Sequence, residues 1–457
     1  MTGTLFGTDG IRAVAGEEPL TPGTVARLAF SFGELLRAKH TSSGADRRPF
    51  ALVGHDGRAS ADFLVAAVEA GLAAAGVDFQ ETGLVTTPGL STLVREMEAA
   101  GGAMLSASHN PAHDNGIKLF GRGGEKLGDA DEAEIERRVA ATPQKSGHGH
   151  REFGQHRLGS LIRPEIYLGG LIERAGIAEG ALRGRKVAFD GAHGGGSELG
   201  PELLRSLGAE VVEIGTAPNG KNINDGVGAL HPETLAKAVL EHGCCFGVAL
   251  DGDGDRSMCV DEQGHILDGD GVIAACAPDL KHRGRLPGQT VVVSVMSNLG
   301  LAARLREQGI ATDVVPVGDR HLVARLKEKG YALGAEPSGH VIFGSENHYI
   351  GDGLFTALRI LELLQRTGKP FSELAAFPRF EQVLLNVRVV RRDPLETVAP
   401  IEEARRSAAQ ALGDRGRIVL RYSGTEPLCR VMVEAADKPT AQRHADAIAD
   451  AVRRTLA

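Results

Sequence analysis

The chain has 457 residues, of which 42% are hydrophobic and 24% charged, and its net charge is −8. This composition predicts a soluble globular protein of three or four domains, since a domain holds about 100–150 residues. No apolar run approaches the ~20 residues that span a bilayer, and the N-terminus lacks a signal-like pattern. No basic block offers a surface for nucleic acid or an anionic membrane. We therefore expect a cytoplasmic protein with neither a nucleic-acid nor a membrane partner.

An α/β unit recurs three times along the chain: a strand, a turn, an amphipathic helix and a second strand that ends in glycine. The three units span residues 50–83, 186–215 and 290–318. Strands that alternate with helices at these lengths predict largely parallel sheets. After residue 370 the pattern changes to strand, helix, two strands and helix, which predicts a smaller α+β domain. Residues 141–150 are polar and lack periodicity, so we expect an interdomain linker there.

Ser108 follows an apolar stretch, Gly101–Leu105, that predicts a short buried strand. Asn110 and Pro111 end that strand, because proline has no N–H and favours extended geometry in its predecessor. Ser108 should therefore stand on an irregular loop beside His109. There it is either a reactive hydroxyl or an ordinary turn residue.

Three aspartates at alternate positions follow a predicted buried strand: Asp251, Asp253 and Asp255. The glycines between them let the backbone curl so that the carboxylates converge, and three hard oxygen ligands are typical of Mg²⁺. The spacing to Glu262 also fits a calcium EF-hand loop. Against that alternative, Arg256 stands where the loop needs glycine, and the flanks predict strands rather than helices. A solvated acidic turn is the third interpretation.

Two further loops have polar side chains at suggestive positions. Residues 421–427, with Arg430 following, combine two guanidiniums, two hydroxyls and a glycine, which indicates a phosphate cradle between two strands or an ordinary hairpin with surface arginines. Glu336, Ser338 and His340 alternate, so an extended chain would point all three to one side. They could read sugar hydroxyls there, or simply line a polar loop.

Near the N-terminus, Phe6-Gly-Thr-Asp-Gly-Ile-Arg12 predicts a capped turn or an arginine held near an anion. Asn115-Gly-Ile-Lys118 predicts a tight turn into a strand that returns Lys118 toward Ser108. Together the loops offer a hydroxyl nucleophile, a divalent metal, a phosphate clamp and a reader of hydroxyl groups. Their sum is phosphoryl transfer on a sugar phosphate.

These motifs, in this order and over essentially the whole chain, resemble the α-D-phosphohexomutase superfamily. Residues 218–224, Pro-Asn-Gly-Lys-Asn-Ile-Asn, are similar to its glucosamine branch. The resemblance implies three similar α/β mixed-sheet domains plus a smaller C-terminal α+β domain around a central cleft. The implied domains are residues 1–155 with the phosphoserine loop, 156–257 with the metal loop, 258–370 with the sugar-binding loop and 371–457 with the phosphate-binding loop.

The resemblance also implies the chemistry and its residues. The expected enzyme is an isomerase that interconverts glucosamine 6-phosphate and glucosamine 1-phosphate and so supplies UDP-N-acetylglucosamine synthesis. A bisphosphorylated hexose is its intermediate and activator. Ser108 would be a phosphoserine, with one Mg²⁺ per chain bound by its phosphate and by Asp251, Asp253 and Asp255. Lys118, Arg12 and His109 match positions that transfer protons and support the phosphoserine. The matching substrate-binding positions are Arg256, Glu336, Ser338, His340, Arg421, Ser423, Gly424, Thr425 and Arg430.

Two residues depart from the superfamily pattern: Pro337, in the variable middle of the sugar loop, and Ala13, where glycine is usual. Because of Pro337, a phosphoglucomutase or phosphomannomutase is the close alternative. A non-catalytic calcium-binding module and a phosphatase are further alternatives, although a hydrolase would not need a second phosphate clamp. A homodimer is expected from the superfamily alone.

Overall fold

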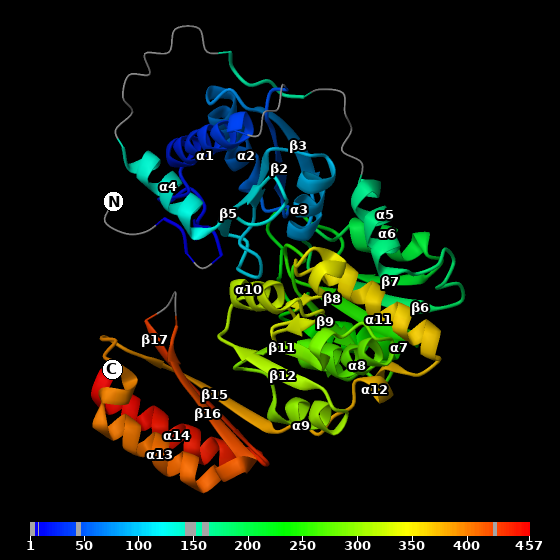
Figure 1. The fold of residues 1–457 in the computed structure, drawn as a ribbon, viewed down its shortest axis with the longest axis vertical. Helices are drawn as coiled ribbons and strands as arrows, with labels where there is room; N and C mark the ends of the chain where they lie inside the picture. Colours follow the sequence, from blue (N-terminus) through cyan, green and yellow to red (C-terminus); the bar gives the residue numbers. More distant parts are fainter. Residues whose placement is uncertain (1–4, 8, 43–46, 142–151, 158–163, 424–426) are drawn as a thin grey trace. The chain divides into compact units, whose positions relative to one another are not determined.

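The computed structural model describes residues 5–457 except 8, 43–46, 142–151, 158–163 and 424–426. The chain divides into two compact units, whose elements are labelled in Figure 1. The first unit is Met1–Gly269 with Ser338–Leu374, and the second is Asp270–Pro337 with Ala375–Ala457. The predicted linker lies outside the described residues, apart from Ala141 at the end of helix α4 (Asp129–Ala140).

The first unit begins with a five-stranded mixed sheet in the order β1-β5-β4-β2-β3. The central strand β4 is parallel to β2, which is parallel to β3, while β5 is antiparallel to both of its neighbours. All five residues of β4 are buried, as expected for a strand covered on both faces. The elements are β1 (Ile11–Val14), α1 (Pro22–Ser42), β2 (Phe50–His55), α2 (Ala61–Ala74), β3 (Asp78–Leu84), α3 (Thr87–Glu96), β4 (Gly101–Leu105) and β5 (Asp114–Gly121).

A second mixed sheet in the same unit repeats this arrangement, in the order β10-β9-β8-β6-β7. Its central strand β8 is fully buried, parallel to β6 and antiparallel to β9. The elements are α5 (Pro164–Ala175), β6 (Lys186–Asp190), α6 (Leu199–Ser206), β7 (Glu210–Ile214), α7 (Pro232–His242), β8 (Phe246–Leu250), β9 (Ser257–Val260) and β10 (Ile266–Leu267). Four later elements complete the unit: β14 (Val341–Ile342), η2 (Gly344–Asn347), α11 (Gly353–Thr367) and α12 (Phe371–Leu374).

The loops that carry Ser108 and the three aspartates occupy equivalent places in the two sheets. Each loop follows a buried central strand, β4 or β8, and leads into the antiparallel strand beside it. The repeat expected from sequence thus places the two loops at the ends of corresponding strands.

The second unit holds two smaller sheets. In one, β11 is parallel to both β12 and β13. In the other, β17 is antiparallel to β15 on one side and to β16 on the other, and α13 and α14 lie along it (Figure 1). The elements are α8 (Gly269–His282), η1 (Pro287–Gln289), β11 (Thr290–Ser294), α9 (Leu299–Glu307), β12 (Ala311–Val315), α10 (Asp319–Lys329), β13 (Gly334–Ala335), β15 (Glu381–Arg388), η3 (Leu395–Thr397), α13 (Ala399–Leu412), η4 (Gly413–Arg415), β16 (Gly416–Tyr422), β17 (Leu428–Ala435) and α14 (Lys438–Leu456). None of the described helices is long and apolar enough to cross a membrane.

The three repeated units and the final strand–helix–strand–strand–helix pattern are confirmed, but one predicted turn is wrong. Asn115 and Gly116 lie inside β5, where they pair with Ala13 and Arg12 of β1. A Cβ atom at position 116 would stand 2.4 Å from the Ser106 carbonyl oxygen and 2.6 Å from that of Ile11. This glycine therefore permits close approach of neighbouring backbones, and pairing on both sides overrides the turn preference of Asn-Gly.

Close packing of α1 on α2 gives a stability prediction. A Cβ at Gly71 of α2 would lie 2.4 Å from the Ala26 carbonyl oxygen of α1, whereas a Cβ at Gly169 of α5 would meet nothing within 4 Å. Gly71→Ala should cost about 1–3 kcal/mol through overpacking. Gly169→Ala should instead stabilise by about 0.5–1 kcal/mol, since alanine is the better helix former. Urea denaturation of both variants checks this, and equal effects would contradict the close contact.

Candidate active site

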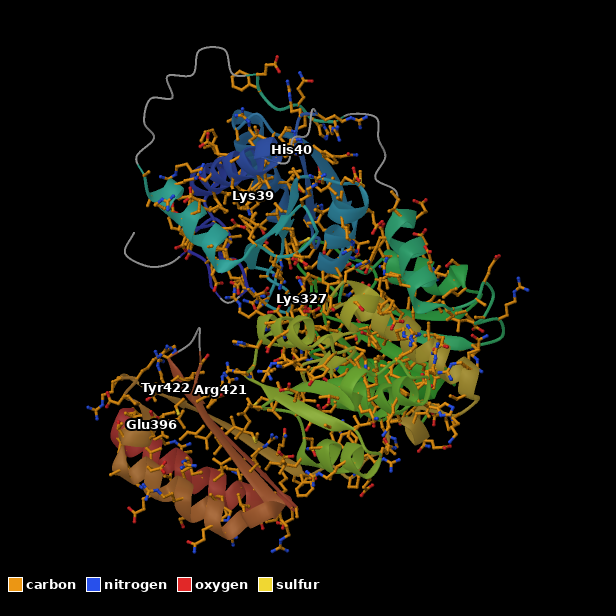
Figure 2. The ribbon with its side chains drawn as sticks, in the orientation of Figure 1. Lys39, His40, Lys327, Glu396, Arg421 and Tyr422 are labelled. Carbon is orange, nitrogen blue, oxygen red and sulfur yellow. The ribbon has the colours of Figure 1, made fainter. Side chains whose placement is uncertain are left out.

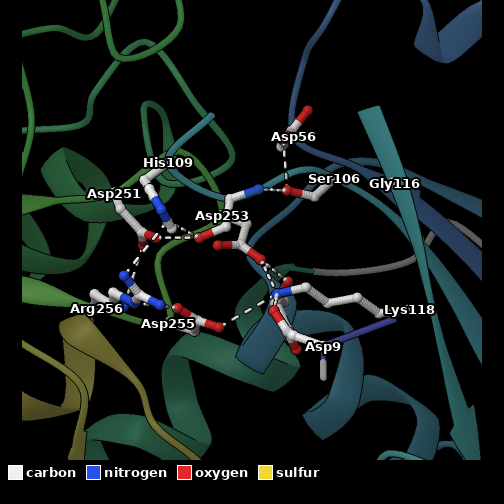
Figure 3. Close-up of polar contacts among 12 residues, drawn as sticks. Asp9, Asp56, Ser106, His109, Gly116, Lys118, Asp251, Asp253, Asp255 and Arg256 are labelled. Atoms are coloured by element: carbon white, nitrogen blue, oxygen red, sulfur yellow. Dashed lines mark hydrogen bonds and ion pairs between the residues drawn. The ribbon is translucent and has the colours of Figure 1, made fainter. Parts of the chain in front are cut away.

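Ser108 is held in an uncommon backbone conformation at the end of β4. Its φ is +53° and its side chain is buried. The Ser106 hydroxyl accepts a hydrogen bond from the Ser108 N–H at 2.8 Å and donates one to Asp56 Oδ2 at 2.6 Å (Figure 3). Positive φ in a residue other than glycine carries strain that the surroundings must hold in place. The surroundings therefore fix the direction of the hydroxyl.

The hydroxyl of Ser108 points to the aspartate loop. Its Oγ donates to Asp251 Oδ2 at 2.6 Å and lies 3.2 Å from Nδ1 of His109. A Cβ on Gly252 would stand 2.5 Å from the Ser108 carbonyl oxygen, so only glycine allows the two loops to come this close. Ser108 and the aspartates are therefore neighbours, although about 140 residues separate them in the chain.

The three aspartates form one buried group, as the sequence predicted. One carboxylate oxygen from each of Asp251, Asp253 and Asp255 lies within 4.8 Å of the others. Oδ1 of Asp253 and Oδ1 of Asp255 are buried and have no hydrogen-bond partner among the described residues. Buried carboxylate oxygens without donors are costly unless a cation compensates them. Converging hard oxygen ligands, two of them without a hydrogen-bond donor among the described residues, fit a divalent cation.

The calcium-loop alternative is wrong. The aspartate loop joins two strands, β8 and β9, where an EF-hand needs two helices. Glu262, the residue at the last ligand position of such a loop, hydrogen-bonds the Ser372 hydroxyl and accepts from the Ser372 N–H at 3.3 Å. It does not belong to the carboxylate group.

Lys118 balances part of this negative charge from the neighbouring strand β5. Its Nζ lies 2.7 Å from Asp253 Oδ2, 3.3 Å from Asp255 Oδ2 and 3.1 Å from Asp9 Oδ2. Burial alone would lower the pKa of Lys118, but the three carboxylates hold it well above its usual value. Lys118 is therefore a buried cation, and it contacts the aspartates rather than the Ser108 hydroxyl.

Asp9 connects Lys118 to two further cations. Its Oδ2 accepts from Arg12 at 2.6 Å, and its Oδ1 lies 2.5 Å from Lys126 Nζ. Arg12, predicted to sit near an anion, is thus anchored by Asp9, while its Nε is buried with no partner among the described residues. That N–H is available to an anion beside the carboxylate group.

Two histidines, His109 and His340, lie beside Arg256 and Asp255 of the aspartate loop. His109 Nδ1 lies 3.4 Å from Nη1 of Arg256, and burial, Arg256 and Arg12 lower the pKa of His109 to about 4. His109 is therefore neutral at pH 7. Nδ1 of the buried His340 lies 3.8 Å from Asp255 Oδ1.

The pKa values of Asp251 and Asp255 shift in opposite directions. Burial, Asp253 and Asp255 raise the pKa of Asp251 to about 7. Burial also opposes ionisation of Asp255, but Lys118 and His340 hold its pKa well below the usual value. In the absence of a cation and below about pH 7, Asp251 therefore holds a proton, whereas Asp255 stays ionised.

The predicted sugar-loop row is not extended. Pro337 and Ser338 form a turn and Gly339 has φ +87°, so the alternation of side chains expected from sequence is wrong here. Proline fixes its own φ and favours turns. Glu336, in the second unit, accepts from the Gly318 N–H at 2.9 Å, while Ser338 is exposed.

In the second unit, the predicted phosphate cradle places two arginines directly opposite each other. Arg421 of β16 pairs with Arg430 of β17, and Nη2 of Arg430 lies 3.4 Å from the Ser423 hydroxyl. Figure 2 shows Arg421 and Tyr422 toward the end of β16. Burial and Arg430 lower the pKa of Arg421. Like charges in directly opposite positions destabilise a sheet, and the Glu336 carboxylate offsets part of this effect on the pKa of Arg421. Gly424 and Thr425, predicted in the same cradle, are outside the described residues.

Several residues of the site were not predicted. Asp9 and Lys126 anchor the buried cations, and Thr87 donates to Asp253 Oδ2 at 2.5 Å. Arg58 and Asn224 both bind the Ser108 carbonyl oxygen, at 2.9 and 3.0 Å. The sequence held local signals for four of them, since Arg58 and Thr87 each come just after a predicted strand. Asp9 lies in the motif of residues 6–12, and Asn224 ends the segment of residues 218–224.

Family models match almost the whole chain. They describe phosphoglucomutase/phosphomannomutase α/β/α domains I, II and III, at residues 3–146, 165–264 and 268–380, and the C-terminal domain at residues 384–451. Curated relatives narrow the group. Phosphoglucosamine mutase of Symbiobacterium thermophilum is 43% identical over 99% of both chains, and that of Frankia alni is 46% identical over 99% of this chain and 98% of its own.

The chain belongs to the phosphoglucosamine mutase family. Solved structures agree with this family's fold of three α/β/α domains and a C-terminal domain. A phosphoglucomutase/phosphomannomutase family protein from Burkholderia thailandensis has a TM-score of 0.79 at 26% identity, covering 99% of this chain and 97% of its own. The N-acetylphosphoglucosamine mutase of Aspergillus fumigatus, solved with GlcNAc-6P and magnesium, has a TM-score of 0.65 at 18% identity, covering 99% and 96%. The predicted family and fold class are confirmed.

The raised pKa of Asp251 predicts how cation binding depends on pH. A cation must displace the proton that Asp251 holds below about pH 7, so affinity should rise by up to about tenfold per pH unit below that value and level off above it. Calorimetric titration with Mn²⁺ between about pH 5.5 and about pH 8.5 measures this. In the control, Asp251→Asn should bind more weakly and lose most of the pH dependence. Constant affinity in the wild-type protein across this range would contradict the assignment.

Proposed function

We propose that this protein interconverts glucosamine 6-phosphate and glucosamine 1-phosphate by passing phosphoryl groups through Ser108. One observation carries the proposal: the buried Ser108 hydroxyl lies 2.6 Å from a group of three carboxylates that fits a divalent cation. Full-length relatives named phosphoglucosamine mutase support the same reaction. The product then supplies UDP-N-acetylglucosamine synthesis.

The reaction has two transfers. First, the sugar's 1-hydroxyl oxygen attacks the phosphorus on phospho-Ser108, the bond from phosphorus to Ser108 Oγ breaks, and a bisphosphorylated hexosamine forms. The bisphosphate then reorients, and Ser108 Oγ attacks the phosphorus of the 6-phosphate. Breaking the bond to O6 restores phospho-Ser108 and leaves the 1-phosphate. The 1-hydroxyl gives up one proton and the departing O6 takes one up, so the cycle is balanced.

The neighbouring side chains suit these steps. We assign proton transfer to His109, whose Nδ1 lies 3.2 Å from Ser108 Oγ. Lys118 stays protonated and, with Arg12, adds positive charge beside the phosphoserine. We assign contact with the sugar phosphate to Arg256 and His340, which lie near His109 and Asp255.

We assign Mg²⁺ to Asp251, Asp253, Asp255 and the phosphate of Ser108. When bound, Mg²⁺ would neutralise charge on the phosphoryl oxygens. The carboxylate oxygens of Asp253 and Asp255 that lack a hydrogen-bond donor among the described residues support this assignment, as does the presence of magnesium in the fungal enzyme.

We assign the second phosphate of the substrate to the cradle of Arg421, Ser423 and Arg430, with Gly424 and Thr425 between them, and the sugar hydroxyls to Glu336, Ser338 and His340. The opposed arginines support the first assignment, because an anion would relieve their repulsion. The four domain boundaries, the cytoplasmic location and a homodimer stay predictions.

Substrate comparison tests the proposed reaction. We expect kcat/KM to be higher for glucosamine phosphate than for glucose or mannose phosphate, measured with Mg²⁺ and a hexose bisphosphate as activator. A clear preference for glucose or mannose would assign the protein to the phosphoglucomutase or phosphomannomutase activity instead. Steady release of inorganic phosphate that matches substrate loss would show a phosphatase.

The phosphate cradle gives a second prediction. Arg430→Gln should lower kcat/KM by about tenfold or more, since a charge-assisted hydrogen bond contributes about 1.5–3 kcal/mol. The melting temperature should stay equal or rise, because the repulsion with Arg421 is removed. Arg388→Gln, an exposed change in the same sheet, is the control and should alter neither value. Unchanged kcat/KM in Arg430→Gln would remove Arg430 from the substrate site.

A further inference from the structure

The segment Pro218–Asn224, which resembles the glucosamine branch, ends on the Ser108 loop rather than on a sugar-binding loop. Nδ2 of Asn224 donates to the Ser108 carbonyl oxygen at 3.0 Å and to that of Asn110 at 3.3 Å. Asn224 is buried, and its own N–H donates to the Ala192 carbonyl at 2.9 Å. Its φ is +60°, a conformation that asparagine tolerates better than most residues.

Arg58, which follows strand β2 of the first sheet, donates to the same two carbonyl oxygens. Its Nη2 donates to Ser108 at 2.9 Å and to Asn110 at 2.8 Å, and its Nη1 donates to the carbonyls of Pro111 and Asp114. The guanidinium is fully buried, and its Nε donates to Asp56 Oδ2 at 2.9 Å. Every guanidinium nitrogen of Arg58 thus donates either to the backbone of this loop or to Asp56.

The two chain segments that carry Arg58 and Asn224 are joined through their backbones. The Gly220 carbonyl oxygen accepts from the Ala59 N–H at 2.9 Å, and a Cβ at Gly220 would lie 2.9 Å from the Ala59 Cβ. The segment that carries Asn224 therefore docks on the residue after Arg58. One carbonyl oxygen, that of Ser108, receives a donor from each of the first two sheet domains.

We propose that Arg58 and Asn224 are positioning residues that form a clamp on the Ser108 and Asn110 carbonyls and so aim the phosphoserine for transfer. Neither side chain contacts the Ser108 hydroxyl, so their effect passes through the backbone. A residue at φ +53° needs such fixed partners, because the conformation is strained and the Ser108 carbonyl must also fit against Gly252. Reacting groups displaced by about 1 Å lose rate by up to about a hundredfold. The proposal rests on Ser108 acting as the phosphoryl carrier.

Single-turnover transfer from labelled enzyme tests the clamp. Ser108 is loaded with ³²P from a labelled hexose bisphosphate, and the loading is verified by intact mass. Transfer to glucosamine phosphate is then timed with Mg²⁺ present, at substrate concentrations up to saturation, and KM is measured in steady-state assays of the same variants. The test variant is Asn224→Gly, because glycine removes the donor without strain at positive φ. The matched control is Asn222→Gly, since the Asn222 side chain accepts from the Asn219 N–H at 2.9 Å and donates to the Ala217 carbonyl at 3.0 Å, both close to it in the chain.

We expect Asn224→Gly to slow transfer by about tenfold or more with KM within about twofold of wild type, and Asn222→Gly to keep the wild-type rate. Arg58→Lys, which keeps the charge but cannot reach four carbonyls, should act like Asn224→Gly and gives the same test if that variant folds poorly. Wild-type transfer rates in Asn224→Gly and Arg58→Lys, equal slowing in Asn222→Gly, or a loss confined to KM would overturn the clamp. Failure of the wild-type enzyme to take label on Ser108 would instead overturn the proposed function.

Discussion

The close approach of the Ser108 backbone to the aspartate loop is the constraint on which the rest of the site depends. It requires glycine at position 252 and a left-handed backbone at Ser108. Two fully buried strands, β4 and β8, hold the two loops in position, because each loop follows the central strand of its own sheet. The repeated α/β unit therefore has a role in forming the site, because it brings the Ser108 loop and the aspartate loop, which are distant in the sequence, into contact.

Charge explains why so many polar groups are buried around that point. Three buried carboxylates repel one another, and Lys118 compensates only part of their charge. Asp9 in turn holds Lys118, Lys126 and Arg12. Such a cluster of buried charges destabilises the folded protein when no ligand is bound, and a cation and a phosphate would offset that cost in free energy. The groups that make the site unfavourable when empty are those that would stabilise a phosphoryl group in transfer.

The sequence was sufficient to predict the helices and strands with clear periodicity and the site residues that lie in recognisable local motifs. Ser108 and the three aspartates follow apolar strands, and the arginines at 421 and 430 flank a short loop, so local pattern located them all. It failed where a contact spans the chain. Arg58 and Asn224 reach Ser108 across 50 and 116 residues, and Thr87 reaches Asp253 across 166. It also failed at Asn115-Gly116, where strand pairing overrides turn preference, and at Pro337, where a turn replaces an extended row.

The central claim is that Ser108 carries the phosphoryl group, and intact-mass analysis of purified enzyme tests it most directly. The wild-type protein should contain a fraction heavier by one phosphoryl group, which grows when a hexose bisphosphate is added and persists during turnover, because each cycle restores phospho-Ser108. Ser108→Ala should show no such fraction and should lose almost all mutase activity. Full activity in Ser108→Ala, or a phosphorylated fraction of unchanged size in that variant, would contradict the account.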